Sequence, residues 1–191
     1  MSATNRGGTR RDADYYPTPA WCVDRLLEAV DLPRGEWLEP CAGDGAIMRA
    51  VDAQDWDDHH DMVWTTVDIR EESGADIIAD YLWMGCPELG DKRFDVAITN
   101  PPFGHAEEFV HASLARADIV VMLLRLSWLA SERRAPFMRQ NPPSVYVLPN
   151  RPSFTGDGST DAADYGWFIW GLGGPPRLHV LRSTPPEERR P

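Results

Sequence analysis

The sequence predicts an α/β fold, with a mostly parallel sheet of about seven strands and an antiparallel strand at its edge. Strand-like and helix-like patterns alternate along most of the chain, as in a parallel sheet wrapped by helices. Runs such as "FDVAIT" (94–99) and "DIVVMLLRL" (118–126) are largely apolar, which is typical of strands buried on both faces. Near the end, "SVYVL" (144–148) and "YGWFIWGL" (165–172) flank a loop rich in Gly, Pro and Asp, so we expect these two strands to pair antiparallel.

The first ordered element is predicted to be an amphipathic helix. Residues 1–14 are polar and lack periodicity, so we expect a disordered arm, with order beginning near Tyr15. Thr18 is the candidate N-cap, Pro19 suits the first helical position, and Pro33 follows the end. The apolar positions that form the buried face are 22, 23, 26, 27 and 30.

The remaining elements follow from the same patterns. "GEWLE" is a strand that breaks into the glycine loop "PCAGDGA", and "AIMRAVDA" is the helix behind that loop. A helix is expected over about 106–117, and a shorter one over "SERRAPFMR". Two further strands are expected over 61–69 and, shorter, 75–80.

Length and composition are those of one domain. With 191 residues, of which 42% are hydrophobic, the chain can bury one substantial core, which we expect to span 15–182 and to leave a disordered tail over 183–191. No apolar run reaches the roughly 18 residues of a membrane span, and the N-terminus does not resemble a signal peptide. We therefore expect a cytoplasmic protein without membrane contact. The three cysteines lack metal-ligand spacing and are expected to be reduced.

The net charge of −11 is unevenly distributed. Residues 52–91 hold twelve acidic residues and one basic residue, whereas 110–155 hold six arginines against two acidic residues. An anionic partner is therefore expected to approach the second region. The stretch "DWDDHHD" (55–61) contains metal-ligand residue types, but we expect a solvated acidic loop there and no metal site.

Acidic residues end three successive predicted strands. Glu39 ends the first strand, Asp68 the second and Asp80 the third, with Gly43 and Gly45 in the turn after the first. Open α/β sheets bind ligands at the carboxyl ends of their strands, where an acid can hold ribose hydroxyls. Because the glycine spacing is not G-x-G-x-x-G, a nucleoside without a pyrophosphate is the favoured ligand.

The segment "NPPF" (100–103) ends the apolar strand over 94–99. Two prolines stop a strand and hold the neighbouring carbonyl groups in fixed directions. The side-chain oxygen of Asn100 and the carbonyl of Pro101 can each accept one N–H bond from an exocyclic amine, while Phe103 supplies a stacking face. Such an arrangement would localise the lone pair of an adenine or cytosine amine for attack on an activated methyl group.

The order "YPTP", "EPCAGDGA", "VDI", "AD" and "NPPF" resembles the amino-methylating class of S-adenosylmethionine-dependent DNA methyltransferases. It is most similar to small adenine-N6 enzymes of phage and prophage type, and the resemblance extends from about Tyr15 to Leu172. It implies a Rossmann-like class I methyltransferase fold, S-adenosylmethionine as the cofactor and methylation of adenine N6 in DNA.

The same resemblance implies roles for individual residues. The implied cofactor-binding residues are Tyr15, Pro17, Thr18, Glu39, Pro40, Cys41, Ala42, Gly43, Gly45, Asp68, Ile69, Asp80 and Asn100. The first three of these would line the methionine end of the cofactor, Asp68 would bind ribose and Asp80 would face adenine. The implied catalytic residues, which would bind the target amine, are Asn100, Pro101, Pro102 and Phe103.

A later aromatic residue in this family clamps the extruded base, and Phe154 in "NRPSFTG" stands at the matching place. The alternative is a core phenylalanine. Fewer than twenty residues separate "LLRLSWL" from "SVYVL", which leaves no room for a separate target-recognition domain. We therefore expect a very short recognition site, a single-stranded substrate, or specificity borrowed from a partner, with the enzyme acting as a monomer or homodimer.

Other activities of the same site stay open at this stage. They are adenine-N6 methylation of RNA, cytosine-N4 methylation of DNA and, less favoured, methylation of protein glutamine. A non-catalytic S-adenosylmethionine-binding adaptor is the alternative from another class. The sequence favours DNA as the partner, with RNA possible, and leaves open the recognition sequence and any restriction partner.

Overall fold

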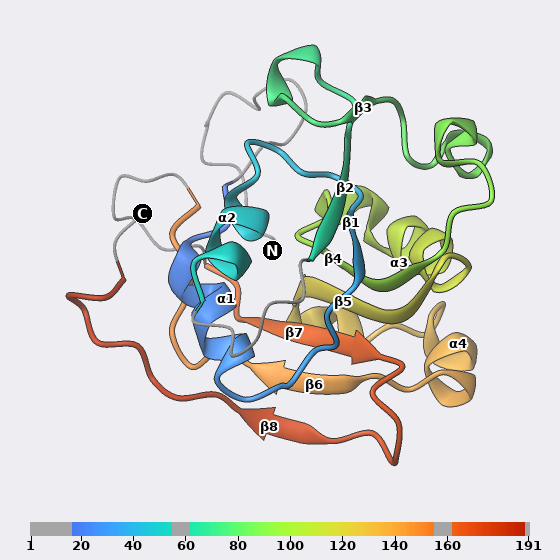
Figure 1. The fold of residues 1–191 in the computed structure, drawn as a ribbon. Coiled ribbons are helices and arrows are strands. Elements are labelled where there is room, and N and C mark those ends of the chain that lie inside the picture. Colours follow the sequence, from blue (N-terminus) through green and yellow to red (C-terminus); the bar gives the residue numbers. More distant parts are fainter. Residues whose placement is uncertain (1–16, 55–61, 155–161, 190–191) are drawn as a thin grey trace, which may run out of the picture.

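An eight-stranded sheet with the strand order β3-β2-β1-β4-β5-β7-β6-β8 forms the centre of the molecule (Figure 1). The computed structural model describes residues 17–54, 62–154 and 162–189. All strands run in one direction except β7, which is antiparallel to both of its neighbours, β5 and β6. The carboxyl ends of the parallel strands therefore meet at one edge of the sheet.

The elements alternate along the chain as the sequence predicts. The strands are β1 (Glu36–Glu39), β2 (Val63–Asp68), β3 (Ile77–Ile78), β4 (Phe94–Thr99), β5 (Ala117–Arg125), β6 (Ser144–Val147), β7 (Tyr165–Trp170) and β8 (Leu178–Val180). The α-helices are α1 (Ala20–Leu27), α2 (Ala46–Asp52), α3 (Ala106–Leu114) and α4 (Ala135–Gln140). Single 3-10 turns are η1 (Glu71–Ser73), η2 (Trp83–Gly85), η3 (Pro87–Leu89), η4 (Phe103–His105) and η5 (Leu126–Leu129).

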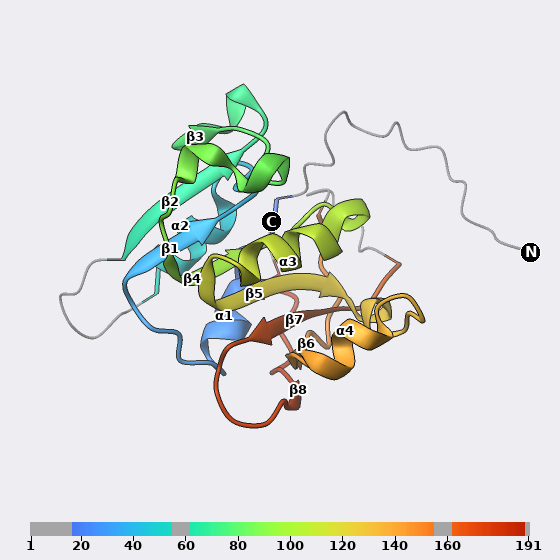
Figure 2. The same cartoon turned by 90° about the vertical axis from the view of Figure 1, so that its right-hand side faces the viewer.

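Helices cover both faces of the sheet. Figure 1 shows α1 and α2 on one side and α3 and α4 on the other, and in Figure 2 the second pair lies in front of the sheet. Strand β5 is apolar at 119–124 because both of its faces are buried: Val121 and Leu123 belong to the core under α1 and α2, whereas Val120 and Met122 belong to the core under α3. Alternate side chains of one strand thus fill two separate cores.

The predicted fold class is confirmed, with two differences at one end of the sheet. Strand β8 pairs parallel with β6 and adds an eighth strand at the edge. Strand β7, expected at the edge, lies between β5 and β6, and all six of its residues are buried. A strand buried on both faces, with Trp167 in one core and Phe168 in the other, is stabilised further by a neighbour on each side.

Helix α1 begins one residue later than predicted. Ala20 is its first residue, Pro19 occupies the N-cap position, and no side chain caps the helix. The hydroxyl of Thr18, which was expected to cap α1, accepts a hydrogen bond from the Asn100 side chain instead. None of the helices in the described parts of the chain is long and apolar enough to cross a membrane.

Two residues of the segment 183–191, which was predicted to be a disordered tail, contact helix α1. Arg25 of α1, a buried residue, donates a hydrogen bond to the Thr184 hydroxyl at 3.1 Å and forms an ion pair with Glu188. Burying a guanidinium costs free energy unless it is paired, and the tail supplies two of its partners. The predicted disordered arm over 1–14, with Tyr15, lies outside the described residues.

Candidate active site

The carboxyl ends of three adjacent strands bring together the polar residues that the sequence singled out. Glu39 ends β1, Asp68 ends β2, and Asn100 directly follows β4. Since β1 lies between β2 and β4, the glycine loop after β1 sits between the other two strand ends. This edge is therefore the candidate active site.

Asp68 holds the glycine loop against β2. The backbone N–H of Gly43 donates to Asp68 Oδ2 at 2.7 Å, and the N–H of Ala42 donates to the carbonyl of Val67 at 3.0 Å. Gly43 and Gly45 have φ angles of +62° and +76°, in the left-handed region that favours glycine. This use of Asp68 within the protein was not predicted from the sequence, because the two bonded residues lie 25 positions apart.

The other carboxylate oxygen of Asp68 is bonded to Arg70. Oδ1 accepts from the Arg70 backbone N–H at 2.9 Å and from Nε at 3.1 Å. Asp68 is 6% exposed, so this pairing compensates a buried negative charge. Because each carboxylate oxygen has two acceptor positions, the group retains capacity for a ligand hydroxyl.

Glu39 is a buried carboxyl group at the end of β1. It is 1% exposed, and its Oε2 accepts a weak bond from the Met48 N–H at 3.3 Å. Burial is the largest influence on this group and raises its pKa well above the usual value. The site thus contains one acidic group that resists ionisation beside another, Asp68, that is held by N–H donors.

Replacing Glu39 by glutamine is expected to stabilise the free protein at neutral pH. Because the pKa is raised, the folded chain binds a proton that the unfolded chain has released, so stability falls as pH rises above about 4.5. Glutamine does not ionise, so the variant does not lose this stability. At neutral pH its melting temperature should exceed that of the unmodified protein by about 2 to 4 °C for each kcal/mol of unfolding free energy that is regained. Melting curves from pH 4 to pH 8 test this. The two proteins should converge at the acidic end, and a constant difference at every pH would contradict the assignment.

The remaining acid, Asp80, lies in a more open position. Asp80 is exposed, and its Oδ1 accepts from the Leu82 N–H at 2.9 Å, so it stabilises the turn after β3. Ile69, which follows Asp68, is also exposed.

Pro40 and Ala42 are buried, and Cys41 is half-buried. Of the three residues predicted at the methionine end, Thr18 is buried, Pro17 is half-buried and Tyr15 lies outside the described residues.

The side chain of Asn100 is held from one side only. Its Nδ2 donates to Thr18 Oγ1 at 3.1 Å, whereas its Oδ1 is buried and accepts no hydrogen bond from any described residue. The Cys41 thiol lies 2.8 Å from Thr99 Oγ1 and 3.5 Å from the Asn100 carbonyl, so the glycine loop contacts the strand end directly. A buried, unpaired amide oxygen is unfavourable unless a ligand supplies a donor.

The two prolines of the segment form a rigid turn into α3. Pro101 is buried, and Pro102 has φ −53° and ψ 124°, an extended conformation. The carbonyl of Pro102 then accepts from the His105 N–H at 2.9 Å, which closes the turn η4. The strand therefore stops where the prolines predict, and Phe103 begins the turn.

Phe103 belongs to a cluster that the sequence did not reveal in full. The Arg125 guanidinium lies over its ring at 4.2 Å from the centroid, and Arg125 Nε donates to the Tyr165 hydroxyl at 3.2 Å. Phe154 packs edge-on against Tyr165 and Phe103, with centroid distances of 5.1 and 6.5 Å. Phe154 thus lies beside Phe103. It is 6% exposed and part of the core, which favours the core alternative over the clamp that the resemblance implies.

The arginines of the basic region differ in their surroundings. Arg133 is 71% exposed and forms an ion pair with Glu107 in the first turn of α3, next to the candidate site. Arg134 is mostly buried, because its guanidinium packs over Trp128 and its Nε donates to the Trp128 carbonyl at 3.0 Å. Sequence alone did not distinguish these adjacent residues, and only Arg133 is available to a partner.

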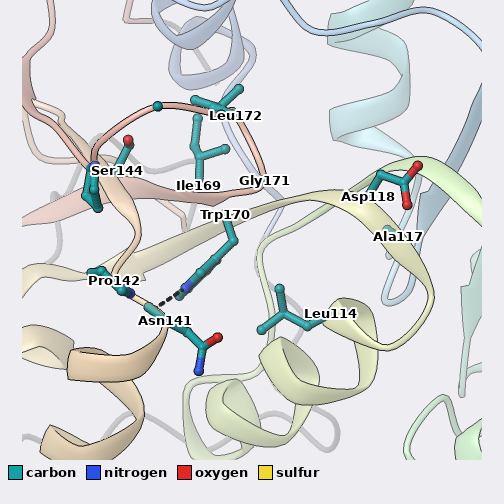
Figure 3. Close-up of a pocket in the computed structure, with 13 residues that line it drawn as sticks. Leu114, Ala117, Asp118, Asn141, Pro142, Ser144, Ile169, Trp170, Gly171 and Leu172 are labelled. Carbon is teal, nitrogen blue, oxygen red and sulfur yellow. Dashed lines mark hydrogen bonds between the residues drawn. The ribbon is translucent and has the colours of Figure 1, made fainter.

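A cavity of about 400 Å³ lies at the opposite edge of the sheet (Figure 3). Its lining includes Ala117 at the start of β5, Ser144 at the start of β6, and Trp170, whose indole donates to the Asn141 carbonyl at 2.9 Å. It contains none of the predicted site residues. Because ligands of open α/β sheets bind at the carboxyl ends, we do not assign the cofactor to this cavity.

The predicted acidic loop over 55–61 lies outside the described residues. Among the residues that are described, no group of three or more His, Cys, Asp or Glu side chains is arranged to hold a metal ion.

The fold is shared with solved methyltransferase structures, although no family model and no curated protein matches the sequence. A Vibrio vulnificus protein, provisionally named as the modification subunit of a type I restriction enzyme, is 17% identical with a TM-score of 0.61, over 94% of this chain and 49% of that one. A Listeria monocytogenes protein, provisionally named as a class I S-adenosylmethionine-dependent methyltransferase, is 14% identical with a TM-score of 0.54, over 88% and 64%.

A third structure, provisionally named as an RNA methyltransferase from Pyrococcus horikoshii, is 14% identical with a TM-score of 0.56, over 88% of this chain and 92% of that one. The chain spans about half the length of the Vibrio protein and less than two thirds of the Listeria protein. These similarities establish the Rossmann-like fold of class I methyltransferases for this chain.

Proposed function

We propose that the chain binds S-adenosylmethionine at the carboxyl ends of β1, β2 and β3 and transfers its methyl group to the N6 amine of adenine in DNA. The observation that carries this proposal is the Asn100 amide. Its oxygen is buried beside the glycine loop and lacks a hydrogen-bond donor among the described residues. A bound molecule with an N–H group would supply that donor.

An exocyclic amine matches this acceptor better than other targets. It carries two N–H groups, of which one can bond to Asn100 Oδ1 and the other to the carbonyl of Pro101. Accepting both bonds draws the nitrogen toward tetrahedral geometry and localises its lone pair. An amide and a carbonyl do not titrate near neutral pH, so they can act as fixed acceptors without a competing proton.

The neighbouring residues fit the proposed cofactor. Gly43 and Gly45, which lack side chains and have positive φ, allow backbone to approach a ligand closely, while Asp68 and Glu39 can accept from hydroxyl or ammonium groups. When bound, S-adenosylmethionine supplies a methyl group already activated on a sulfonium. The protein therefore has mainly to hold the amine in line with that group.

The proposed reaction balances without a further reactant. The amine lone pair would form the new C–N bond, while S-adenosylmethionine would supply the methyl group and keep the electrons of the broken C–S bond on its sulfur. A proton then leaves the nitrogen for water. Asn100 and Pro101 hold the amine during this step, and the turn over 100–103 keeps their acceptors in place.

Methyl transfer from labelled S-adenosylmethionine tests the proposal. DNA in single-stranded and double-stranded form, RNA and protein would be offered in parallel, and labelled nucleosides would be separated after digestion. We expect N6-methyladenine from DNA. Label in RNA, in N4-methylcytosine or in protein would show that adenine N6 in DNA is not the substrate and would identify the group that is methylated. Cofactor binding without any transfer would indicate a non-catalytic adaptor.

Arg133 is expected to contact a phosphate of the nucleic acid. Changing Arg133 to glutamate should weaken DNA binding and lower the slope of log K against log salt concentration by about 1, the loss of one phosphate contact. Cofactor affinity should be unchanged. Binding titrations at several salt concentrations measure both quantities.

Arg139, which like Arg133 lies in the segment between β5 and β6, provides a matched control. It is also exposed, but it lies near Asn141, which lines the cavity at the opposite edge of the sheet. Changing Arg139 to glutamate should leave the salt slope close to that of the unmodified protein. Equal slopes for both variants would mean that the nucleic acid does not approach the carboxyl edge.

A further inference from the structure

We infer that Thr18 is a positioning residue that holds the Asn100 side-chain amide with its oxygen turned away from Thr18, and this inference rests on the proposed function. Thr18 precedes α1 and Asn100 follows β4, 82 positions later. Thr18 Oγ1 accepts from Asn100 Nδ2 at 3.1 Å, and Thr18 is 5% exposed. The hydrogen bond therefore joins two separate elements in a partly buried place.

The direction of the amide matters because its two ends have opposite properties. Oδ1 accepts hydrogen bonds and Nδ2 donates them, and rotation by 180° about the last side-chain torsion exchanges the two. With Nδ2 bonded to Thr18, Oδ1 must point away from Thr18, and it is the atom left without a donor. In the reversed direction, an N–H would face the N–H of the target amine.

Thr18 does not cap helix α1. A threonine just before a helix often caps it, but α1 has Pro19 at its N-cap position and no side-chain cap. The hydroxyl oxygen is used by the Asn100 amide across the site. We therefore infer that Thr18 acts on the proposed reaction only indirectly, by holding the side chain of Asn100.

The first test compares valine and serine at position 18. Thr18→Val keeps the shape but removes the acceptor, and we expect kcat to fall about tenfold, equivalent to about 1.4 kcal/mol, with the KM for DNA unchanged. Thr18→Ser keeps the hydroxyl and should restore most of kcat. Unchanged kcat in the valine variant, or weaker cofactor binding at unchanged kcat, would overturn the inference.

A second test repeats the valine change in the Asn100→Asp background. A carboxylate presents an oxygen to the amine whichever way it is turned, so the direction no longer matters. We expect Thr18→Val to have little further effect on the transfer rate there. A tenfold loss that persists in this background would show that Thr18 acts by another route.

A third measurement does not depend on activity. The side-chain amide signal of Asn100 in an NMR spectrum can be assigned by its absence in Asn100→Asp. We expect its exchange with water to be slow in the unmodified protein and in Thr18→Ser, and fast in Thr18→Val. If no substrate is methylated, the proposed function fails, yet this signal still decides the Thr18 contact. Fast exchange in the unmodified protein would overturn it.

Discussion

Asn100→Ala is expected to reduce methyl transfer by about 100- to 1,000-fold, the usual cost of removing one preorganised hydrogen-bonding group from a reacting centre. The alanine cannot accept from the target amine, and the carbonyl of Pro101 remains as the single acceptor. Cofactor affinity should be retained, since Asn100 Oδ1 faces the target in the proposed arrangement. Single-turnover transfer and calorimetry with S-adenosylmethionine measure the two effects separately.

Asp68→Ala is the control for this experiment. It removes the carboxylate that holds the Gly43 N–H and Arg70, so it should weaken cofactor binding, unlike the change at Asn100. Asn100→Asp should keep part of the activity because it retains an acceptor. If Asn100→Ala lost as much cofactor affinity as Asp68→Ala, Asn100 would belong to the cofactor site and its proposed contact with the amine would be wrong.

Phe154→Ala should destabilise the protein by about 3 to 5 kcal/mol, the range for removing a buried phenylalanine ring. The ring is buried against Tyr165 and Phe103, so its loss leaves a cavity between β7 and the turn after β4. At about 2 to 4 °C per kcal/mol in a domain of this size, the melting temperature should fall by at least about 6 °C. Thermal unfolding of the purified variant measures this.

Phe154→Leu distinguishes packing from base stacking. Leucine fills most of the space and should keep most of the stability, with target affinity little changed, if the ring acts in the core. A base clamp would require an aromatic face, and its loss would cost about 1 to 3 kcal/mol of target binding. If Phe154→Ala and Phe154→Leu both kept the melting temperature and both bound the target more weakly, Phe154 would act as a base clamp and its role in the core would be wrong.

The arrangement of acids at the strand ends follows from local features of the sequence. Largely apolar runs identify strands buried on both faces, and alternation with helices requires most of those strands to be parallel. Parallel strands end at one edge, so Glu39, Asp68 and Asn100 had to lie along that edge, and the order of the strands decided that they are neighbours there. The stop at the two prolines is equally local, since it depends on the missing N–H groups alone.

Contacts between distant residues were decided by the tertiary structure. The bonds from Gly43 to Asp68 and from Asn100 to Thr18 depend on which strands are neighbours and on side-chain direction, and no pattern along the chain contains that information. The same holds for Phe154, whose burial depends on Tyr165 eleven positions later. It also holds for the end of the chain, where Thr184 and Glu188 bond to Arg25 of the first helix.

Two further features could not be predicted from patterns along the chain. They are strand β8 and the different surroundings of Arg133 and Arg134. "LHV" is too short and too exposed to give a strand pattern, and it is a strand only because β6 offers hydrogen bonds at the sheet edge. The two arginines have identical chemistry, but Trp128 packs under one of them alone. Sequence periodicity by itself determined the fold class and the edge at which the candidate site residues lie, because these depend on residue types taken in order. Packing alone decided each polar partner, because a partner is defined by distance in space.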